Sequence, residues 1–362
     1  MSKAAELAKW GEVSTNGQVS GRRNIAINGA MKVAQRSASV AGLGAATGYF
    51  TLDRYRLDAS ATAGRLTMAQ VAVTDLSGFA NAMKLTCTTA DTSIAAGEIL
   101  GIRQFFEGQD VQQLKKGTSD AEKFTVSFFV KGNANATYTC EISDTDNTRI
   151  IAQEFSVTSS WNRVVLTFDG DTTGVYDDDN ARSMDFSLFL HAGSTFTGGT
   201  FSSNTYHATD NQRIGDNQTS FFDSTDRTFF FTGLQIEVGS QATPFEHRSF
   251  GEELALCQRY FWQFGTGDPN YTPIGTGVSE GSFSNVAMFY PTKMRTAPSI
   301  AYSSGVKVFD GSTSTDITST RGSYIGLQSI NFQPNHGSLT VGRGIYASLS
   351  GTSEYFSFDS EL

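Results

Sequence analysis

Alternating hydrophobic and polar positions dominate this chain. The clearest runs are FTVSFFVKG from Phe124, ATYTCEIS from Ala136, EFSVTSSWNRVVLTF from Glu154 and MDFSLFLHAGS from Met184. Alternation of this kind indicates a β-strand with one buried face. Because turn-forming residues separate the runs at intervals of roughly 8 to 15 residues, the pattern predicts an all-β fold of the sandwich or jelly-roll type.

Weaker runs predict further strands near the beginning of the chain. Ile25 and Ile27 alternate as a first strand, which the turn-forming pair Asn28-Gly29 would end. Val33, Phe50, Leu52, Tyr55 and Leu57 supply further strand positions, and strands are also predicted at 65–73, 82–88 and 99–106.

The stretch from Phe229 to Tyr260 predicts a boundary between two domains. A strand is expected from Phe229 to Val238, with the more apolar set Phe230, Thr232, Leu234, Ile236 and Val238 on its buried side. A turn fixed by Pro244 and a short helix after Gly251 follow. We therefore expect an N-terminal helix and tether at 1–24, a β-sandwich jelly roll at 25–248, and at 249–362 a short linking helix with a second, smaller β-sandwich.

The residues between the two predicted domains are candidates for a rigid junction. We expect Pro244 and Phe245 to stiffen the turn, and Glu246, His247 and Arg248 to tie the domains together. A catalytic role for His247 between its charged neighbours is the competing interpretation. In the second domain, strands are predicted at 282–290, 299–302, 306–309, 323–332, 339–346 and 354–358.

Composition and charge narrow the classes of partner. The chain has 362 residues, 28 of them Phe and only 3 Trp, so phenylalanine is expected to dominate the core. A net charge of −9 gives no basic excess for a nucleic-acid backbone. No signal peptide or run of about 18 apolar residues is visible, so neither secretion by the ordinary route nor membrane insertion is expected.

Cysteine usage suggests a reducing compartment. Cys87, Cys140 and Cys257 are odd in number, widely spaced and outside any CxxC pattern. Reduced, buried thiols are therefore expected rather than a disulfide framework or a zinc site.

The first residues resemble a docking helix. Ser2 can cap a short helix that ends before Gly11, and the following segment to Gly21 is polar and contains glycine. Because so short a helix is marginal without a partner, Leu7 and Trp10 are candidate contacts to a larger assembly. A frayed terminus packed by Trp10 is the alternative.

The acidic segment FDGDTTGVYDDDN is the most distinctive polar cluster. Asp169, Asp171, Asp177 and Asp179 would repel one another, and a structural calcium ion would relieve that repulsion. The spacing does not match an EF-hand loop, and a solvated acidic loop is the competing interpretation. No other cofactor is expected.

Aromatic residues in predicted loops are candidates for sugar binding. Tyr176, Phe201, Tyr206 and Tyr271 could stack on sugar rings beside polar groups, although packing within the core or loops would also explain each of them. The four histidines are scattered, and no hydrolase, metalloprotease, P-loop or dinucleotide motif is present, so no catalytic residue is assigned and a non-enzymatic protein is expected.

Several segments together resemble tail-fibre and head-fibre or decoration proteins of tailed bacteriophages of the marine and cyanobacterial type. They are RRNIAINGAMKVAQRS with DRYRL, the FDGDTTGVYDDDN loop, FTGLQIEVGSQATPFEHRSFGEELALCQRYF, YPTKMRTAPS and the terminal DSEL. FTVSFFVKG and SSWNRVVLTF also resemble strands of carbohydrate-binding jelly rolls.

The resemblance implies a structural or adhesive virion protein, assembled in the host cytoplasm. It implies a homotrimer that contacts other virion proteins and binds a host surface polysaccharide, and it transfers no catalytic residue. A capsid decoration protein that stabilises the shell is the main alternative. A polysaccharide depolymerase is the enzymatic one.

Overall fold

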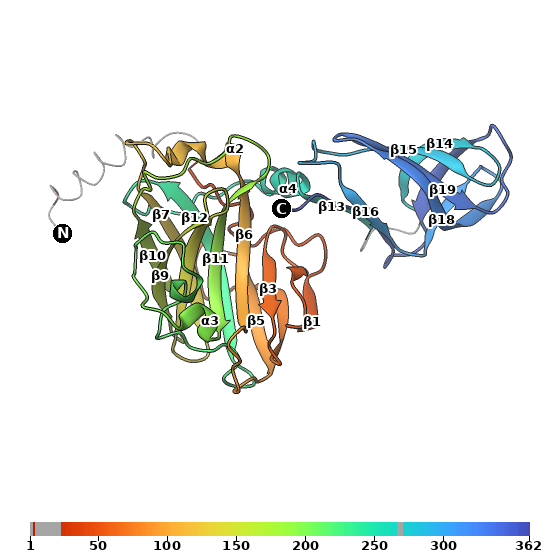
Figure 1. Ribbon diagram of the computed structural model, residues 1–362. Helices are drawn as coiled ribbons and strands as arrows, with labels where there is room; N and C mark the ends of the chain where they lie inside the picture. Colours follow the sequence, from red (N-terminus) through yellow and green to blue (C-terminus); the bar gives the residue numbers. More distant parts are fainter. Residues whose placement is uncertain (1–2, 4–22, 266–270) are drawn as a thin grey trace. The chain divides into compact units, whose positions relative to one another are not determined.

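The computed structural model describes residue 3 and residues 23–265 and 271–362, which form two compact units (Figure 1). The larger unit extends to Glu253 and also contains Leu362, and the smaller unit is Leu254–Glu361. The division falls inside helix α4 (Phe250–Gln258), whereas the sequence places it before residue 249. Both units consist mainly of antiparallel strands, so the all-β fold class is confirmed.

The larger unit is a sandwich of two six-stranded sheets. Sheet A has the order β1 (Ser39–Leu43), β4 (Arg65–Ala72), β5 (Asn81–Thr89), β12 (Thr228–Val238), β7 (Phe124–Gly132) and β10 (Asn162–Phe168). Sheet B has the order β2 (Gly48–Tyr49), β3 (Arg56–Ser60), β6 (Ile99–Glu107), β11 (Arg182–Ala192), β8 (Ala136–Asp144) and β9 (Arg149–Val157). The connections contain the short helices α2 (Gly108–Val111), η1 (Gln112–Leu114), α3 (Ser194–Thr197) and η2 (Asp210–Gln212).

Phenylalanine and leucine together supply most of the large side chains in the core between these sheets. The ring of Phe231 on β12 lies 5.6 Å from that of Phe128 on β7 and 6.2 Å from that of Phe186 on β11. All three side chains are fully buried. Because Phe186 belongs to sheet B and the other two to sheet A, this aromatic cluster joins the two layers of the sandwich.

A bulge in β12 changes which face of the strand is buried. Phe229 and Phe231 point into the core together with Leu234 and Ile236, so the inward positions change from odd to even numbers. The register against β7 shifts between Thr232 and Gln235, and Gly233 has φ of +69°. The prediction that one alternating set would be buried along the whole strand is therefore wrong for its first half, because an extra residue reverses the alternation.

The segment around Ile25 is not a strand of either sheet. It runs beside β12, where the Ile25 amide donates to the Ile236 carbonyl at 2.9 Å and the Leu234 amide donates to the Gly29 carbonyl at 3.1 Å. The predicted turn at Asn28 is present, since Asn28 has φ of +58° and its carbonyl accepts from the Met31 amide. Phe50, Leu52 and Tyr55 are also outside strands.

The smaller unit differs in detail from the expected second sandwich. Six strands close into a barrel: β14 (Pro273–Ser279), β15 (Ser284–Phe289), β19 (Ser329–His336), β18 (Ser314–Ile325), β17 (Val306–Phe309) and β20 (Gly344–Leu349). The other three, β13 (Phe261–Gly265), β21 (Tyr355–Asp359) and β16 (Ser299–Tyr302), form a separate sheet. The barrel closes because β14 pairs with both β15 and β20, which leaves it no free edge.

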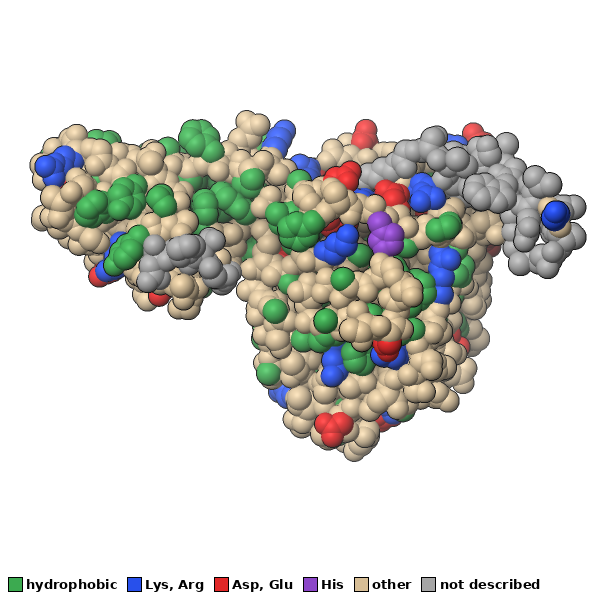
Figure 2. Space-filling model, turned by 180° about the vertical axis from the view of Figure 1, so that it is seen from behind, with side chains coloured by type: hydrophobic (Ala, Val, Ile, Leu, Met, Phe, Trp, Pro, Cys, Tyr) green, Lys and Arg blue, Asp and Glu red, His purple; other side chains and the backbone are tan. Residues whose placement is uncertain are grey.

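Three further facts concern the surface, the thiols and the helices of the described residues. Hydrophobic side chains are spread over the face of the smaller unit that is visible in Figure 2. Cys87, Cys140 and Cys257 are buried and form no disulfide, which confirms the expectation from their spacing. No helix among the described residues is long and apolar enough to cross a membrane.

Candidate functional site

The outer face of sheet B carries the polar cluster that we consider the candidate site. Along its central strand β11, Met184, Phe186, Leu188 and Leu190 point into the core. The alternate residues, which include Asp185, Ser187 and Phe189, therefore lie on the other face of the sheet.

Neighbouring strands extend this face in register. Ser187 is paired with Arg103 on β6 and with Glu141 on β8, and Asp185 is paired with Phe105 on β6 and Ser143 on β8. Directly paired residues of antiparallel strands have side chains on the same face. Two adjacent rows of charged, hydroxyl and aromatic side chains thus cross the middle of sheet B.

Each buried carboxylate in these rows is held by an arginine. Arg182 donates through Nε to Asp185 at 2.6 Å and through Nη2 to the same carboxylate, which also accepts from the Ser143 hydroxyl at 3.1 Å. Arg213 donates through Nε and Nη2 to Glu141 at 2.8 and 2.7 Å. Such two-point pairs fix both the position and the plane of the guanidinium group.

Two phenylalanine rings support these guanidinium groups from below. The Arg182 guanidinium lies 3.7 Å from the centre of the Phe105 ring, and those of Arg103 and Arg213 each lie 5.4 Å from that of Phe189. Both rings are fully buried, whereas the Arg182 side chain is 32% exposed. The surface therefore presents rigid guanidinium groups rather than open aromatic rings.

Electrostatics favour the charged pairs. Burial alone would lower the pKa of Arg213, but the charge and hydrogen bonds of Glu141 outweigh it and raise that pKa. The same balance, with Asp185 as the partner, raises the pKa of Arg182. Arg103 completes the set by pairing with Asp58 at 3.1 Å, so the cationic groups of the face are matched by carboxylates.

A hollow of about 280 Å³ lies over this face. Its lining includes Arg103, Arg182, Asp185 and Arg213, with Thr145 and Asp210 at exposed positions. We call this hollow with its lining the sheet B groove. Fixed planar donors and carboxylate oxygens can hydrogen-bond the hydroxyl groups of a neutral sugar without introducing a net charge.

The four predicted sugar-stacking aromatics do not form one surface. Tyr176 is buried in the core, where burial raises the pKa of its hydroxyl well above the usual value, so its selection as an exposed stacking residue is wrong. Tyr206 packs against the same core and donates to the Asp169 carbonyl at 3.0 Å. Phe201 is half-buried, and Tyr271, 58% exposed, belongs to the smaller unit.

The structure does not bring the predicted calcium carboxylates together. Asp169 pairs with Lys123 at 2.6 Å, whereas both oxygens of Asp171 accept from Arg149 at 2.5 and 3.0 Å. The Asp179 carboxylate accepts from the Ala181 amide, and the Asp177 amide donates to Asp146. No group of three or more His, Cys, Asp or Glu side chains among the described residues could hold a metal ion. Calcium binding stays a prediction.

The predicted junction residues hold the segment that begins at Arg23. The Glu246 carboxylate accepts from the amides of Arg23 and Asn24 at 2.7 and 2.8 Å, and the Arg248 guanidinium donates to the carbonyls of Asn24 and Ala26. We call Glu246 and Arg248, with the segment 23–26 that they hold, the N-terminal clamp. All of these groups belong to the larger unit.

Their neighbours in the same stretch pack locally. The Phe245 ring lies 4.8 Å from that of His247 and 5.0 Å from that of Phe79, and the Pro244 carbonyl accepts from Gln235 at 3.4 Å. Burial and then the charge of Lys32 lower the pKa of His247. A role for Pro244, Phe245, Glu246, His247 and Arg248 in linking the two units stays a prediction. Leu7 and Trp10, the docking candidates, lie outside the described residues.

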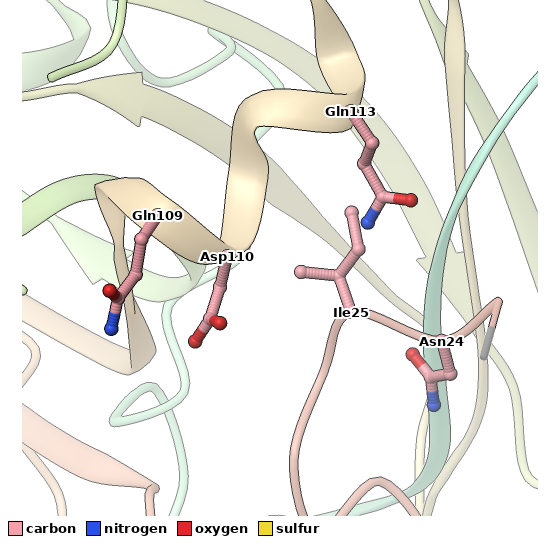
Figure 3. A pocket seen from close by; sticks show the side chains of 5 residues that line it. All are labelled: Asn24, Ile25, Gln109, Asp110 and Gln113. Carbon is pink, nitrogen blue, oxygen red and sulfur yellow. The ribbon is translucent and has the colours of Figure 1, made fainter. Parts of the chain in front are cut away.

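A second hollow, of about 290 Å³, lies beside the N-terminal clamp. Figure 3 shows Asn24 and Ile25 on one side of it, opposite Gln109, Asp110 and Gln113 from α2 and η1. The Asn24 amide is already used, because its nitrogen donates to the Leu234 carbonyl and its oxygen accepts from Ala26 and Ile236. We therefore prefer the sheet B groove as the candidate site.

Sequence reasoning missed the residues that build the sheet B groove. The run MDFSLFLHAGS contains a usable signal, since Asp185, Ser187 and His191 alternate with large apolar residues in a strand between two others. If both faces of this strand were covered by apolar layers, these polar side chains would be buried at a cost in free energy. The alternation therefore indicates that one face of the strand is polar. The partners Arg103, Glu141 and Arg213 come from distant segments and are identified only by strand pairing and the loop that contains η2.

Comparisons with known proteins give a distant similarity in fold. No family model matches the chain, and no curated protein matches it in sequence. Among solved structures, it is similar to a CBM4 module (13% identity, 58% of this chain and 97% of that one, TM-score 0.30). It is also similar to a CBM61 module in complex with β-1,4-galactotriose (8%, 60% and 99%, 0.31). The enzymatically active domain of tailspike protein 4 from bacteriophage CBA120 is a third match (10%, 59% and 21%, 0.31). At these values the similarity assigns neither a family nor a ligand.

Proposed function

We propose that the larger unit binds a neutral surface polysaccharide through the sheet B groove. The observation that carries this proposal is the set of arginine–carboxylate pairs, fixed in register over Phe105 and Phe189 and bordering an open hollow. Pre-organised polar groups lose little conformational entropy on binding, which favours recognition of hydroxyl groups. Because the guanidinium groups are already matched by carboxylates, neutral sugars are favoured over uronic acids or sulfated sugars.

We further propose that this binding serves a non-enzymatic virion appendage protein of a tailed bacteriophage. The segments that resemble tail-fibre and head-fibre proteins support this role. The groove supports an adhesive function over hydrolysis, because both oxygens of Asp185 and of Glu141 already accept hydrogen bonds from a guanidinium group. Glycoside cleavage uses a pair of carboxyl groups, one of them free to protonate the leaving oxygen. Asp210 is the exposed carboxylate in the lining of the groove, and alone it does not supply that pair.

A blocking substitution tests the groove directly. Thr145→Trp would place an indole at an exposed position of the groove lining, and we expect at least a tenfold loss of affinity for a bound glycan. Thr158→Trp is the matched control, because both threonines are exposed and their hydroxyls donate to nearby carbonyls, of Arg182 and Ser160 respectively. Binding is measured on an array of neutral and acidic polysaccharides and then by calorimetry. Equal affinity of the two variants would contradict the location of the site.

Position in the particle tests the virion role. Immunogold labelling is expected at the tail, whereas uniform labelling of the capsid would favour the decoration protein. Deletion of residues 1–21, which contain Leu7 and Trp10, should abolish incorporation into particles while the body stays folded. Release of reducing sugar from a host polysaccharide would instead support a depolymerase.

We also propose that the protein is a homotrimer. Phe289 on β15 and Tyr324 on β18 are 75% and 72% exposed on the barrel, which supports self-association through the smaller unit. Light scattering should then give three times the chain mass of 39.0 kDa, and Phe289→Ser with Tyr324→Ser should reduce it. A monomer at micromolar concentration would contradict this proposal.

A further inference from the structure

A buried ammonium group occupies an oxygen cage beside sheet B. The Nζ atom of Lys116 lies 2.6 Å from Asp144 Oδ2 and 3.2 Å from Asp171 Oδ2. It also donates to the carbonyl oxygens of Thr173 and Gly174, each at 2.8 Å. The side chain is only 4% exposed, so four oxygens from two separate segments, the end of β8 and the loop 169–176, take the place of water around this charge.

The mixture of oxygens is that of a hard-cation site. Two carboxylate and two main-chain carbonyl oxygens are the donors by which proteins bind such ions. The loop is also shaped for close approach: Gly174 has φ of +73°, and a Cβ atom there would lie 2.5 Å from Asn147 Cγ. Asn147 in turn donates to Asp144 and to the Val175 carbonyl, so the wall of the cage is itself fixed.

The charges inside the cage balance only when the lysine is present. Lys116 and Arg149 are matched by Asp144 and Asp171, all largely buried except Arg149, whose side chain is 26% exposed. Without the ammonium group, two buried carboxylates would share one guanidinium, which leaves an uncompensated buried negative charge. A small cation from solution could then restore the balance.

We propose that Lys116 serves as a built-in structural cation, which holds the loop 169–176 against β8 without a metal, and that its removal opens a cation site. The ammonium joins Asp144 at the end of β8 to Asp171, Thr173 and Gly174 of that loop. The acidic segment that suggested a calcium loop is thus stabilised by a cation that the chain itself supplies. This inference does not rest on glycan binding by the groove, although Asp144 belongs to both the cage and the lining of the groove.

The main test compares Lys116→Met with Lys115→Met. Lys115 is the matched control because it is the adjacent lysine, 53% exposed and paired with Glu122. We expect Lys116→Met to lower Tm by roughly 10 °C and Lys115→Met by no more than about 2 °C. Calcium chloride or methylammonium chloride should raise Tm of Lys116→Met more than choline chloride of equal ionic strength, and should leave the wild type unchanged.

A calcium-dependent rise of Tm in the wild type would overturn the proposal, as would equal effects of the two substitutions or equal responses of Lys116→Met to all three salts. Because Lys116→Met could fail to fold, amine acylation of the native wild-type protein provides a second test. Mass spectrometry should find Lys116 unmodified under conditions that modify Lys123, which is 60% exposed. Modification of both lysines at the same rate in folded protein would also overturn it.

Discussion

At the scale of single residues, Phe231 is the side chain of the larger unit with the largest set of aromatic ring contacts among the described residues. Its ring contacts those of Tyr55, Phe128, Phe186 and Phe229, at centroid distances from 5.6 to 6.4 Å. We expect Phe231→Ala to cost about 3–5 kcal/mol of unfolding free energy, because it leaves a cavity between the two sheets. Urea unfolding measures this, with Phe250→Ala, at a 56% exposed position of the larger unit, as the control that should cost little.

Asp171 predicts a pH dependence of stability. Burial alone would raise the pKa of its carboxyl, but hydrogen bonds from Arg149 and Thr173 and the charge of Lys116 together lower that pKa. A pKa below that of the unfolded chain gives stability that is present above about pH 4 and is lost as the pH falls through the folded-state value. The difference in Tm between the wild type and Asp171→Asn should therefore shrink from pH 6 to pH 3. A constant difference would contradict this assignment.

The cysteines predict a simple chemical behaviour. Burial raises the pKa of the Cys87 and Cys140 thiols, and all three cysteines are buried. Because the thiolate is the reactive form, the native protein should not react with a disulfide reagent within minutes. All three thiols should react in denaturant, and rapid reaction of the native protein would show that the thiols are accessible.

At the scale of elements, the bulge at Gly233 lets β12 point Phe229 and Phe231 into the core before the bulge, and Leu234 and Ile236 after it. A Cβ atom at this position would lie 2.9 Å from carbon atoms of Phe129 and Phe79, and its φ of +69° disfavours other residues. Gly233→Ala should therefore cost about 1–3 kcal/mol. Gly251→Ala is the control: it lies in α4 with no atom within 4 Å of the added Cβ, so it should be neutral or stabilising.

Element positions could largely be predicted from the sequence, whereas their relations could not. The strands at Phe124–Gly132, Ser299–Tyr302 and Val306–Phe309 have the predicted bounds, because alternation and turn residues are local signals. The pattern does not predict β1, β13 and β14, since β1 and β14 are rich in small residues and β13 lacks alternation. The single strand predicted at 323–332 is wrong, because a turn between Ile325 and Ser329 separates β18 from β19 there. The barrel follows from pairing between segments that are distant in the chain, which no local pattern encodes.

The limit of local sequence patterns also explains why the sequence does not predict the residues of the candidate site. Aromatic residues in loops were selected because exposed rings bind sugars, but Tyr176 is needed to fill the core under the acidic loop. The rings that do contribute, Phe105 and Phe189, lie beneath guanidinium groups. In the sequence alone, Arg103, Arg182 and Arg213 cannot be told apart from ordinary surface charges. Their positions beside Asp58, Asp185 and Glu141 are evident only in the folded structure.

At the scale of the whole molecule, two separate cores predict two unfolding events. The barrel and the three-stranded sheet share one core, which includes Phe332, Phe356 and Phe358, and the sandwich has another. In calorimetry, Phe356→Ala should shift only one transition and Phe231→Ala only the other. A single transition that moves equally in both variants would show that the units unfold together.

The N-terminal clamp has a mechanical consequence. Glu246 and Arg248 bind the main chain of residues 23–26 close to β12, which is an interior strand of sheet A rather than an edge strand. In a particle that holds the protein by residues 1–22, tension from an attached cell would enter the fold at Arg23. The clamp would pass that tension to the interior of the sandwich, so that the attachment resists the shear of moving water.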